Sequence, residues 1–216
     1  MKRFSIFLLF LIVGCALNAQ DDYRNYVLSR TMLNGTGTSY LDNITYYDGL
    51  GRPFQTVQKA VQSGLPVNKN LATLQEYDAA GREWNSWLPT FAGSSDYLAP
   101  AGIKSSAPGN YDNDSRPYSQ PVYKASPLNR LTAQYGPGAA WYNAGRPVKT
   151  EYLLNTNASP LKCIKYGVSS TGGLTGNSTT FYTSGELSVV KTTDEDLNVS
   201  YSFTAKQGRT VLNRQL

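Results

Sequence analysis

One repeated six-residue pattern constrains the fold of this chain more than any other feature of its sequence. Tyr-Asp-x-x-Gly-Arg occurs at residues 47–52 and again at residues 77–82. In each copy the tyrosine can end a strand, and the aspartate carboxylate can accept backbone N–H bonds from residues further along, as in an Asx-turn. The glycine supplies the positive φ that closes the turn, and the arginine begins the next strand. The pattern therefore predicts two hairpin turns with a structural role for Tyr47, Asp48, Gly51, Arg52, Tyr77, Asp78, Gly81 and Arg82.

A degenerate copy of the pattern spans residues 193–216. It keeps the Gly-Arg pair at 208–209, but other residues stand in place of Tyr-Asp. The alternating run Thr210 to Arg214 predicts a final strand that forms a hairpin with Val199 to Thr204. We expect the chain to end before the repeat architecture is complete, which would leave this hairpin at the edge of the sheet. Its outer edge should be open to pairing with another chain, because an unprotected edge strand presents unpaired N–H and C=O groups.

Composition and alternation both indicate a mainly β fold. Only 16% of residues are charged, whereas tyrosine (16), glycine (19) and proline (11) are abundant, which favours a loop-rich β protein over a helical bundle or a coiled coil. Alternating runs bounded by turn residues predict antiparallel strands. The predicted strands are Tyr26–Leu33, Tyr40–Tyr47, Phe54–Val61, Ala72–Tyr77, Lys149–Leu154, Lys162–Tyr166, Thr179–Tyr182, Glu186–Thr192, Val199–Thr204 and Thr210–Arg214.

The segment from Pro89 to Pro137 should form long, irregular connections, because it holds seven of the eleven prolines and few alternating runs. One short helix is expected within it. Ser126 is a suitable N-cap, Pro127 fits the first helical position and Gly136 lies just past the end. The predicted fold class is therefore mainly β, built from antiparallel hairpins with long Pro-rich loops and one short helix.

The N-terminus has the order of a signal peptide, with two basic residues followed by an apolar run from Phe4 to Val13. One cleavage site makes 1–19 the signal peptide and 20–216 the mature domain. The alternative, a lipobox, removes residues 1–14 and leaves a lipidated Cys15. We expect an exported protein that is secreted, periplasmic or on the cell surface. It contacts a membrane, as an outer-membrane lipoprotein, only if Cys15 is lipidated.

The cysteines predict no disulfide framework. Either cleavage leaves Cys163 without an intramolecular partner. Cys163 lies in an alternating, strand-like run, which favours a buried small residue over a reactive thiol. Stability should therefore come from an ordinary apolar core.

The sequence offers little catalytic chemistry. It contains no histidine, which excludes an imidazole base and a Ser-His-Asp triad. Asp48 and Asp78 could be a carboxylate pair, but both occupy turn positions that need an aspartate. The runs 112–114 and 194–196 resemble calcium-binding segments, yet neither has the glycine and distal glutamate of an EF-hand loop, so solvated turns are favoured. We expect no enzyme activity, no catalytic residue, no cofactor and no metal.

Charge and aromatic residues bear on the partners. The full chain carries a net charge of +5, and loss of Lys2 and Arg3 with the signal peptide would leave +3. The basic residues are scattered, so no nucleic-acid partner is expected. Trp84, Trp87 and Trp141 could stack on sugars, although aromatic residues at strand spacing more often lie in a core.

The Tyr-Asp-x-x-Gly-Arg pattern resembles the signature of RHS repeats, also called YD repeats. Proteins with such repeats wind long chains into a large β-structured shell or spiral, which encapsulates a C-terminal toxin in some of them; others are cell-surface or adhesive proteins. Other parts of the chain are similar to an uncharacterised N-terminal domain that precedes the repeats of secreted RHS proteins in Gram-negative bacteria. These parts are residues 46–53, 116–119, 125–130, 137–141 and 192–194, and the resemblance covers roughly residues 26–216.

The resemblance implies a non-catalytic, structural N-terminal segment of a secreted RHS-repeat protein, and the small number of repeats favours a fragment or truncated copy. Its partners would be the remainder of an RHS polypeptide or envelope polymers. A cell-surface module that recognises glycan or envelope components is the alternative hypothesis. A hydrolase is the least favoured.

Overall fold

The computed structural model describes residues 24–62, 69–93, 96–176 and 179–216. Within these ranges, eleven strands form one antiparallel sheet in the order β1-β2-β3-β4-β5-β6-β7-β8-β11-β12-β13, and β9 pairs with β10 in a separate hairpin. The predicted mainly β class is confirmed. The strands are β1 (Asn25–Met32), β2 (Tyr40–Tyr47), β3 (Pro53–Gln62), β4 (Lys69–Tyr77), β5 (Glu83–Phe91), β6 (Tyr118–Tyr123), β7 (Leu131–Tyr135), β8 (Val148–Leu154), β9 (Gly167–Val168), β10 (Leu174–Thr175), β11 (Ser188–Thr193), β12 (Val199–Thr204) and β13 (Thr210–Gln215).

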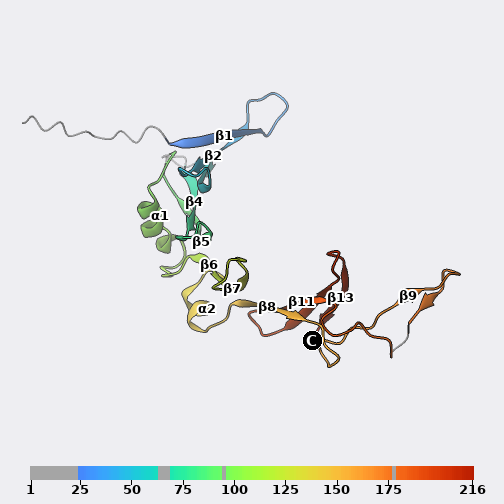
Figure 1. Ribbon diagram of the computed structural model, residues 1–216. Helices are drawn as coiled ribbons and strands as arrows, with labels where there is room; N and C mark the ends of the chain where they lie inside the picture. The colour runs from blue at the N-terminus through green and yellow to red at the C-terminus, as the bar shows by residue number, and fades with distance from the viewer. Residues whose placement is uncertain (1–23, 63–68, 94–95, 177–178) are drawn as a thin grey trace, which may run out of the picture.

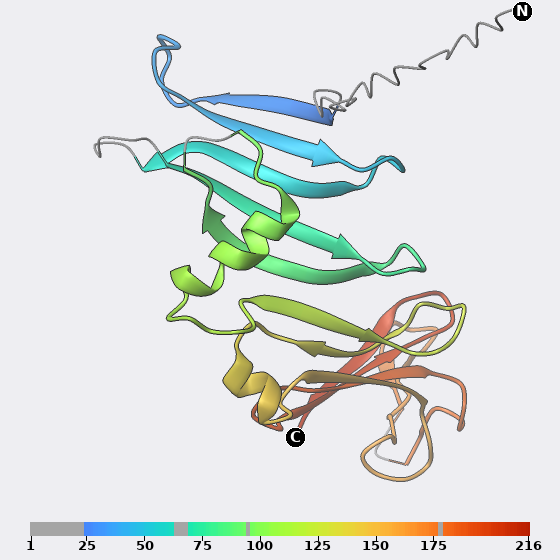
Figure 2. The ribbon, with the colours of Figure 1, turned by 90° about the vertical axis from the view of Figure 1, so that its left-hand side faces the viewer.

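The sheet bends along its length into a crescent, seen edge-on in Figure 1 and with its strands side by side in Figure 2. From β1 to β8 each strand pairs with the next one in the sequence, so this part is a simple meander. Between β8 and β11 the chain leaves the sheet, and the β9–β10 hairpin projects away from the body (Figure 1). In the part of the chain that the structure describes, β1 and β13 are the edge strands of the sheet.

The first half of the sheet buries one of its faces. Ile44, Val57 and Leu74 alternate with more exposed residues along β2, β3 and β4, because successive residues of a strand point to opposite faces. Helix α1 (Pro100–Ser106) covers this face through Ile103, whose side chain is fully buried. The helix lies on the outer side of the crescent in Figure 1.

The second half of the sheet is covered by irregular chain in place of a helix. Val189, Tyr201 and Phe203 of β11 and β12 form a core with Cys163 and Leu187 from the segment between β8 and β11. The prediction that Cys163 is a buried residue is confirmed, and burial raises the pKa of its thiol.

The helix predicted after Ser126 does not form. Residues 126–130 make the turn between β6 and β7. Ser126 Oγ accepts a hydrogen bond from the Leu128 N–H at 3.4 Å, and Asn129 has a φ of +49°, which interrupts a helix. Serine and proline favour turns as well as helix starts, so the local pattern did not distinguish the two. Among the described residues, the helices are α1, α2 (Ala139–Asn143) and a 3-10 turn at Pro108–Asn110.

Most of the other predicted strands form. Tyr40–Tyr47 and Val199–Thr204 are β2 and β12, and the final strand β13 pairs with β12 as expected. The strands predicted at 162–166 and 179–182 are wrong. In the described residues their β pairing is limited to a single bridge between Ile164 and Phe181, because this part of the chain packs over the sheet and does not join it.

Candidate functional site: the stacked Tyr-Asp turns

Each Tyr-Asp turn closes a hairpin with the geometry that the pattern predicts. In the first turn the Asp48 N–H donates to the Arg52 carbonyl at 2.9 Å, and the Gly51 N–H donates to the Asp48 carbonyl at 3.0 Å. Asp48 Oδ1 also accepts the backbone N–H groups of Leu50 and Arg52, each at 2.9 Å. Gly51 has a φ of +77°. The second turn repeats these contacts with Asp78, Ala80, Gly81 and Arg82.

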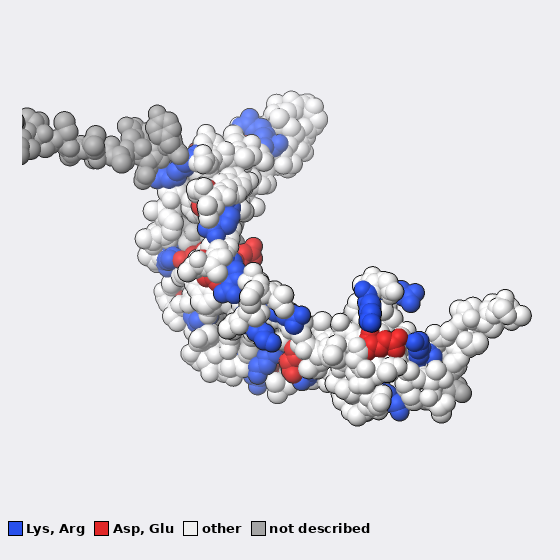
Figure 3. All heavy atoms as spheres, viewed as in Figure 1, with Lys and Arg blue, Asp and Glu red and all other residues white. Residues whose placement is uncertain are grey.

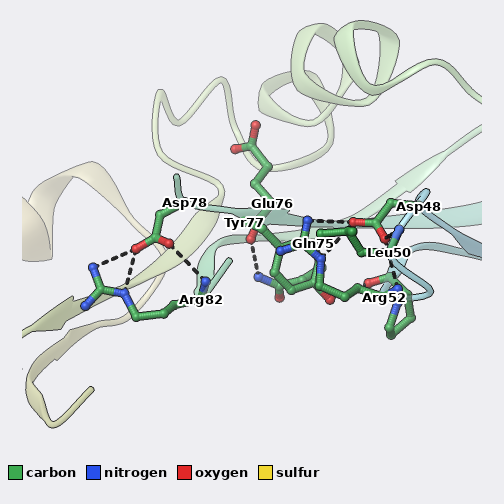
Figure 4. A network of polar contacts seen from close by, with 9 residues as sticks. Asp48, Leu50, Arg52, Gln75, Glu76, Tyr77, Asp78 and Arg82 are labelled. Atoms are coloured by element: carbon green, nitrogen blue, oxygen red, sulfur yellow. Dashed lines mark hydrogen bonds and ion pairs between the residues drawn. The ribbon is translucent and has the colours of Figure 1, made fainter. Parts of the chain in front are cut away.

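The arginine of each turn is held by the same carboxylate. Arg52 Nε donates to Asp48 Oδ2 at 2.8 Å, and Arg52 Nη2 lies 2.7 Å from that oxygen. Arg82 and Asp78 repeat both distances (Figure 4). Hydrogen bonds from the arginine's backbone N–H and then from its side chain hold the pKa of each aspartate carboxyl below its usual range. Both carboxylates are therefore ionised at neutral pH, and both oxygens of each accept hydrogen bonds from within the turn.

The first turn packs against the second. Tyr47 and Tyr77 end β2 and β4, as predicted. The Arg52 guanidinium lies 4.1 Å from the centre of the Tyr77 ring, and the Tyr77 hydroxyl donates to the Pro53 carbonyl at 2.7 Å. Figure 4 shows Arg52 reaching from its own turn toward Tyr77. The two copies are thus joined in both directions, by a cation–π contact and by a hydrogen bond.

The same contact continues along the sheet. The Arg82 guanidinium lies 4.4 Å from the ring centre of Tyr123, at the end of β6, and the Arg130 guanidinium lies 4.9 Å from that of Tyr152 in β8. The series beyond the two signature turns was not predicted, because Lys124 follows Tyr123 where the pattern has aspartate. A tyrosine at the end of a strand, with an arginine at the start of the next, was the signal available in the sequence.

A third turn, at 194–198, has the same geometry without the full signature. The Asp194 N–H donates to the Asn198 carbonyl at 3.0 Å, and the Leu197 N–H donates to the Asp194 carbonyl at 3.1 Å. Asp194 Oδ1 accepts the N–H groups of Asp196 and Asn198. Leu197 takes a φ of +71° at the position where the other copies have glycine.

The degenerate copy forms a fourth turn, at 205–209. The Ala205 N–H donates to the Arg209 carbonyl and the Gly208 N–H donates to the Ala205 carbonyl, both at 2.9 Å. Gly208 has a φ of +79°. No carboxylate takes part in this turn, so the backbone bonds and the left-handed residue are sufficient to form it.

The calcium-like run at 112–114 is also a turn. Asp112 and Asn113 have φ values of +50° and +59°, and Asp114 Oδ1 accepts the N–H groups of Arg116 and Ala139, the latter at the start of α2. Within the described ranges, no group of three His, Cys, Asp or Glu side chains is placed to hold a metal ion.

The three tryptophans occupy different environments. Trp87 packs against the first core, and its Nε1 donates to Glu76 at 2.9 Å. Trp84 and Trp141 leave 36% and 48% of their surface exposed. Only Trp87 therefore belongs to a core.

Charged side chains are distributed along the whole crescent. On the face in Figure 3, Lys and Arg occur from one end to the other with Asp and Glu between them. For the part of the chain that the structure describes, no helix has the length and apolar character needed to cross a membrane.

A comparison with protein families gives one match. The model of a domain of unknown function, DUF6443, matches residues 20–154. This range contains both Tyr-Asp turns and all three arginine–tyrosine contacts of the series, and it ends with β8. Neither the curated proteins nor the solved structures contain a significant match to the chain.

Proposed function

Since this chain belongs to the family of DUF6443, a domain of unknown function, we propose that it is a non-catalytic structural segment of a larger, secreted RHS-repeat protein. The observation that carries this proposal is the stacking of successive hairpins. Each Tyr-Asp turn fixes its arginine, and that arginine packs on the tyrosine of the next hairpin. A unit that binds its successor in this way can be repeated along a growing sheet.

The state of the two turn carboxylates supports a role without catalysis. A general acid needs a raised pKa and a nucleophile needs a free oxygen. Asp48 and Asp78 have lowered pKa values, and both oxygens of each are hydrogen-bonded within the turn. We therefore expect the purified mature chain not to hydrolyse peptide, ester or glycoside substrates. Turnover that is lost in Asp48→Asn or Asp78→Asn, with the fold retained, would contradict the proposal.

The open edges of the sheet support a larger assembly. Strand β13 pairs only with β12 in the described sheet, and an edge strand can take up a further strand. We propose that the remainder of an RHS polypeptide pairs there and that, in its absence, copies of the chain pair with each other. Analytical ultracentrifugation of the mature chain should show association that rises with concentration.

A charge on the edge should weaken this association. Asn213→Lys places a charge at an exposed position of β13, whereas Ser105→Lys adds the same charge to α1. We expect Asn213→Lys to reduce association and Ser105→Lys to leave it unchanged. A monomer at every concentration, or equal effects of the two variants, would contradict edge pairing.

Export belongs to the same proposal. The N-terminal segment with its two cleavage alternatives lies outside the described residues. Sequencing the N-terminus of mature protein would distinguish cleavage after Ala19 from a lipidated Cys15. Intact Met1 on protein recovered from the cytosol would contradict export.

A second proposed function is recognition of glycan at the cell surface, and the exposed Trp141 favours it. This side chain lines a hollow together with charged residues. An exposed aromatic ring beside hydrogen-bonding groups is the kind of surface that sites for small polar ligands use.

A further inference from the structure

An open hollow lies between α2 and the turn at 194–198. It has a volume of about 380 Å³, at the lower end of the range for small-molecule sites of roughly 300–1,000 Å³. Residues from 136–146 and from 195–196, far apart in the sequence, meet here. The residues that line the hollow are Gly136, Pro137, Trp141, Arg146, Glu195 and Asp196.

Helix α2 is held in place without the help of Trp141. Its first N–H group, that of Ala139, donates to Asp114 at 3.0 Å. On the side toward the sheet, the Tyr142 ring lies 3.5 Å from the Arg116 guanidinium and 4.8 Å from the Tyr135 ring. Because these contacts fix the helix, Trp141 is left with 48% of its surface exposed at the edge of the hollow.

Some polar groups that line the hollow form hydrogen bonds or ion pairs within the protein, and others do not. Arg146 Nη1 donates to the Glu195 carbonyl at 3.1 Å and lies 3.8 Å from Asp196 Oδ1. The backbone N–H of Arg146 donates to the Trp141 carbonyl, and the Arg146 guanidinium lies 6.0 Å from the centre of the Trp141 ring. Among the described residues, neither the Glu195 carboxylate nor the Trp141 indole N–H has a hydrogen-bond partner.

The acidic pair at this turn is not required by the turn itself. The corresponding positions are Gly49 and Leu50 in the first turn and Ala79 and Ala80 in the second, with nearly the same backbone. Glu195 and Asp196 are therefore free to serve another purpose, and they face an arginine and a tryptophan from a different element.

We propose that this hollow binds a neutral saccharide. The indole of Trp141 can stack on the apolar face of a pyranose ring, the carboxylates of Glu195 and Asp196 accept bonds from sugar hydroxyls, and the Arg146 guanidinium donates bonds to sugar oxygens. Two carboxylates against one guanidinium disfavour acidic sugars. This site rests on the second proposed function, recognition of glycan, and is independent of the structural one.

The three tryptophans provide the test. The mature chain labelled with ¹⁵N has three indole N–H signals, and the variant Trp141→Phe identifies the one from Trp141. Neutral oligomers of glucose, mannose, xylose and N-acetylglucosamine are titrated in turn, with an oligomer of galacturonic acid as the acidic comparison. We expect at least one neutral oligomer to shift the Trp141 signal, with little change at Trp84 and Trp87, and the acidic oligomer to bind more weakly.

Variants distinguish binding in the hollow beside Trp141 from glycan recognition elsewhere on the protein. Trp141→Ala should weaken binding roughly tenfold, Glu195→Gln should weaken it less, and Trp84→Ala should bind like the wild type. Because Trp141 and Glu195 belong to neither core cluster, Trp141→Ala and Glu195→Gln should unfold at the same urea concentration as the wild type. Binding that survives in Trp141→Ala would overturn this site but leave glycan recognition in place. If no oligomer bound to the wild type, both proposals would be wrong.

Discussion

The first two turns, at 48–52 and 78–82, and the last two, at 194–198 and 205–209, share a backbone but not a sequence. All four have the same pair of backbone hydrogen bonds and a left-handed residue in the fourth position. Only the first two combine aspartate, glycine and arginine. In the described residues, only in these two turns does the arginine pack on the tyrosine ring of a following hairpin.

This difference separates the residues that are needed to form a turn from the residues that pack one turn against another. The turn at 205–209 has no carboxylate, and among the described residues the Arg209 side chain has no partner, yet the turn closes with the same bonds. The aspartate of the full signature adds bonds inside the turn and orients the arginine outward. We infer that the signature encodes contact between hairpins as much as the hairpin itself.

The largest effect is expected from Gly81→Ala. A left-handed conformation costs a residue with a side chain roughly 1–2 kcal/mol, and both Gly81 and Gly51 have a φ near +78°. A Cβ at Gly81 would also lie 3.0 Å from Arg52 Nη1, whereas nothing lies within 4 Å of a Cβ at Gly51. Urea unfolding should therefore show a larger loss of stability for Gly81→Ala than for Gly51→Ala.

The background Arg52→Ala controls for this contact. Without the guanidinium, the two glycine variants should lose the same stability relative to their parent. If Gly51→Ala and Gly81→Ala were already equal in the wild-type chain, Arg52 would not pack on the second turn in solution.

Next in size is the effect of removing an arginine. Arg82 forms an ion pair with Asp78 and a cation–π contact with Tyr123. Each such contact at a partly exposed site is worth on the order of 0.5–1 kcal/mol, so Arg82→Ala should destabilise the fold by about 1 kcal/mol. Arg209→Ala should be close to neutral. Equal melting temperatures for the two variants would contradict a stacking role for Arg82.

Strands β1 to β4 and the two signature turns could be predicted because their causes are local. Strand β5 was not predicted, and β6 and β7 form inside the Pro-rich segment that was expected to be irregular. Alternation along Tyr40–Tyr47 and the Asp-x-x-Gly order in the two signature turns depend only on neighbouring residues. A turn was predicted at 194–196, but its likeness to the signature turns was not, because Leu197 occupies the left-handed position, which the sequence alone marks only when glycine stands there.

The layers that cover the sheet could not be predicted in the same way. Ile103 is buried because the faces of β2, β3 and β4 lie under it. The burial of Cys163 was predicted, but not the strands β11 and β12 that bury it. The partners of these residues are fixed by tertiary packing, not by local sequence. The hollow beside Trp141 has the same origin, since it joins segments about fifty residues apart.

A smaller gain in stability is expected from Leu197→Gly. Leucine is strained at a φ of +71° and its side chain is 70% exposed, so little packing is lost with it. Relief of roughly 1–2 kcal/mol is offset by the greater freedom of glycine in the unfolded chain, about 0.5–1 kcal/mol. The net gain should be about 0.5–1 kcal/mol by urea unfolding. Leu128→Gly, at a similarly exposed turn residue without positive φ, should give no gain; equal gains would contradict the assignment of strain to Leu197.

The smallest effect is expected in the dependence of stability on pH. The pKa of Asp48 and that of Asp78 are lowered in the folded chain, because each carboxylate accepts hydrogen bonds from the backbone and side chain of its arginine. A lowered folded pKa gives stability that is fully present above the unfolded pKa, about 3.9, and is lost as the pH falls through the folded value. The difference in unfolding free energy between the wild type and the double variant Asp48→Asn/Asp78→Asn should therefore be largest at neutral pH and shrink below about pH 4. Ala205→Ser, in the turn without a carboxylate, should keep a constant difference from the wild type over the same range. A constant difference for the double variant as well would mean that the two carboxylates have the same pKa in the folded and unfolded chains, and that their ionisation adds nothing to the stability of the turns.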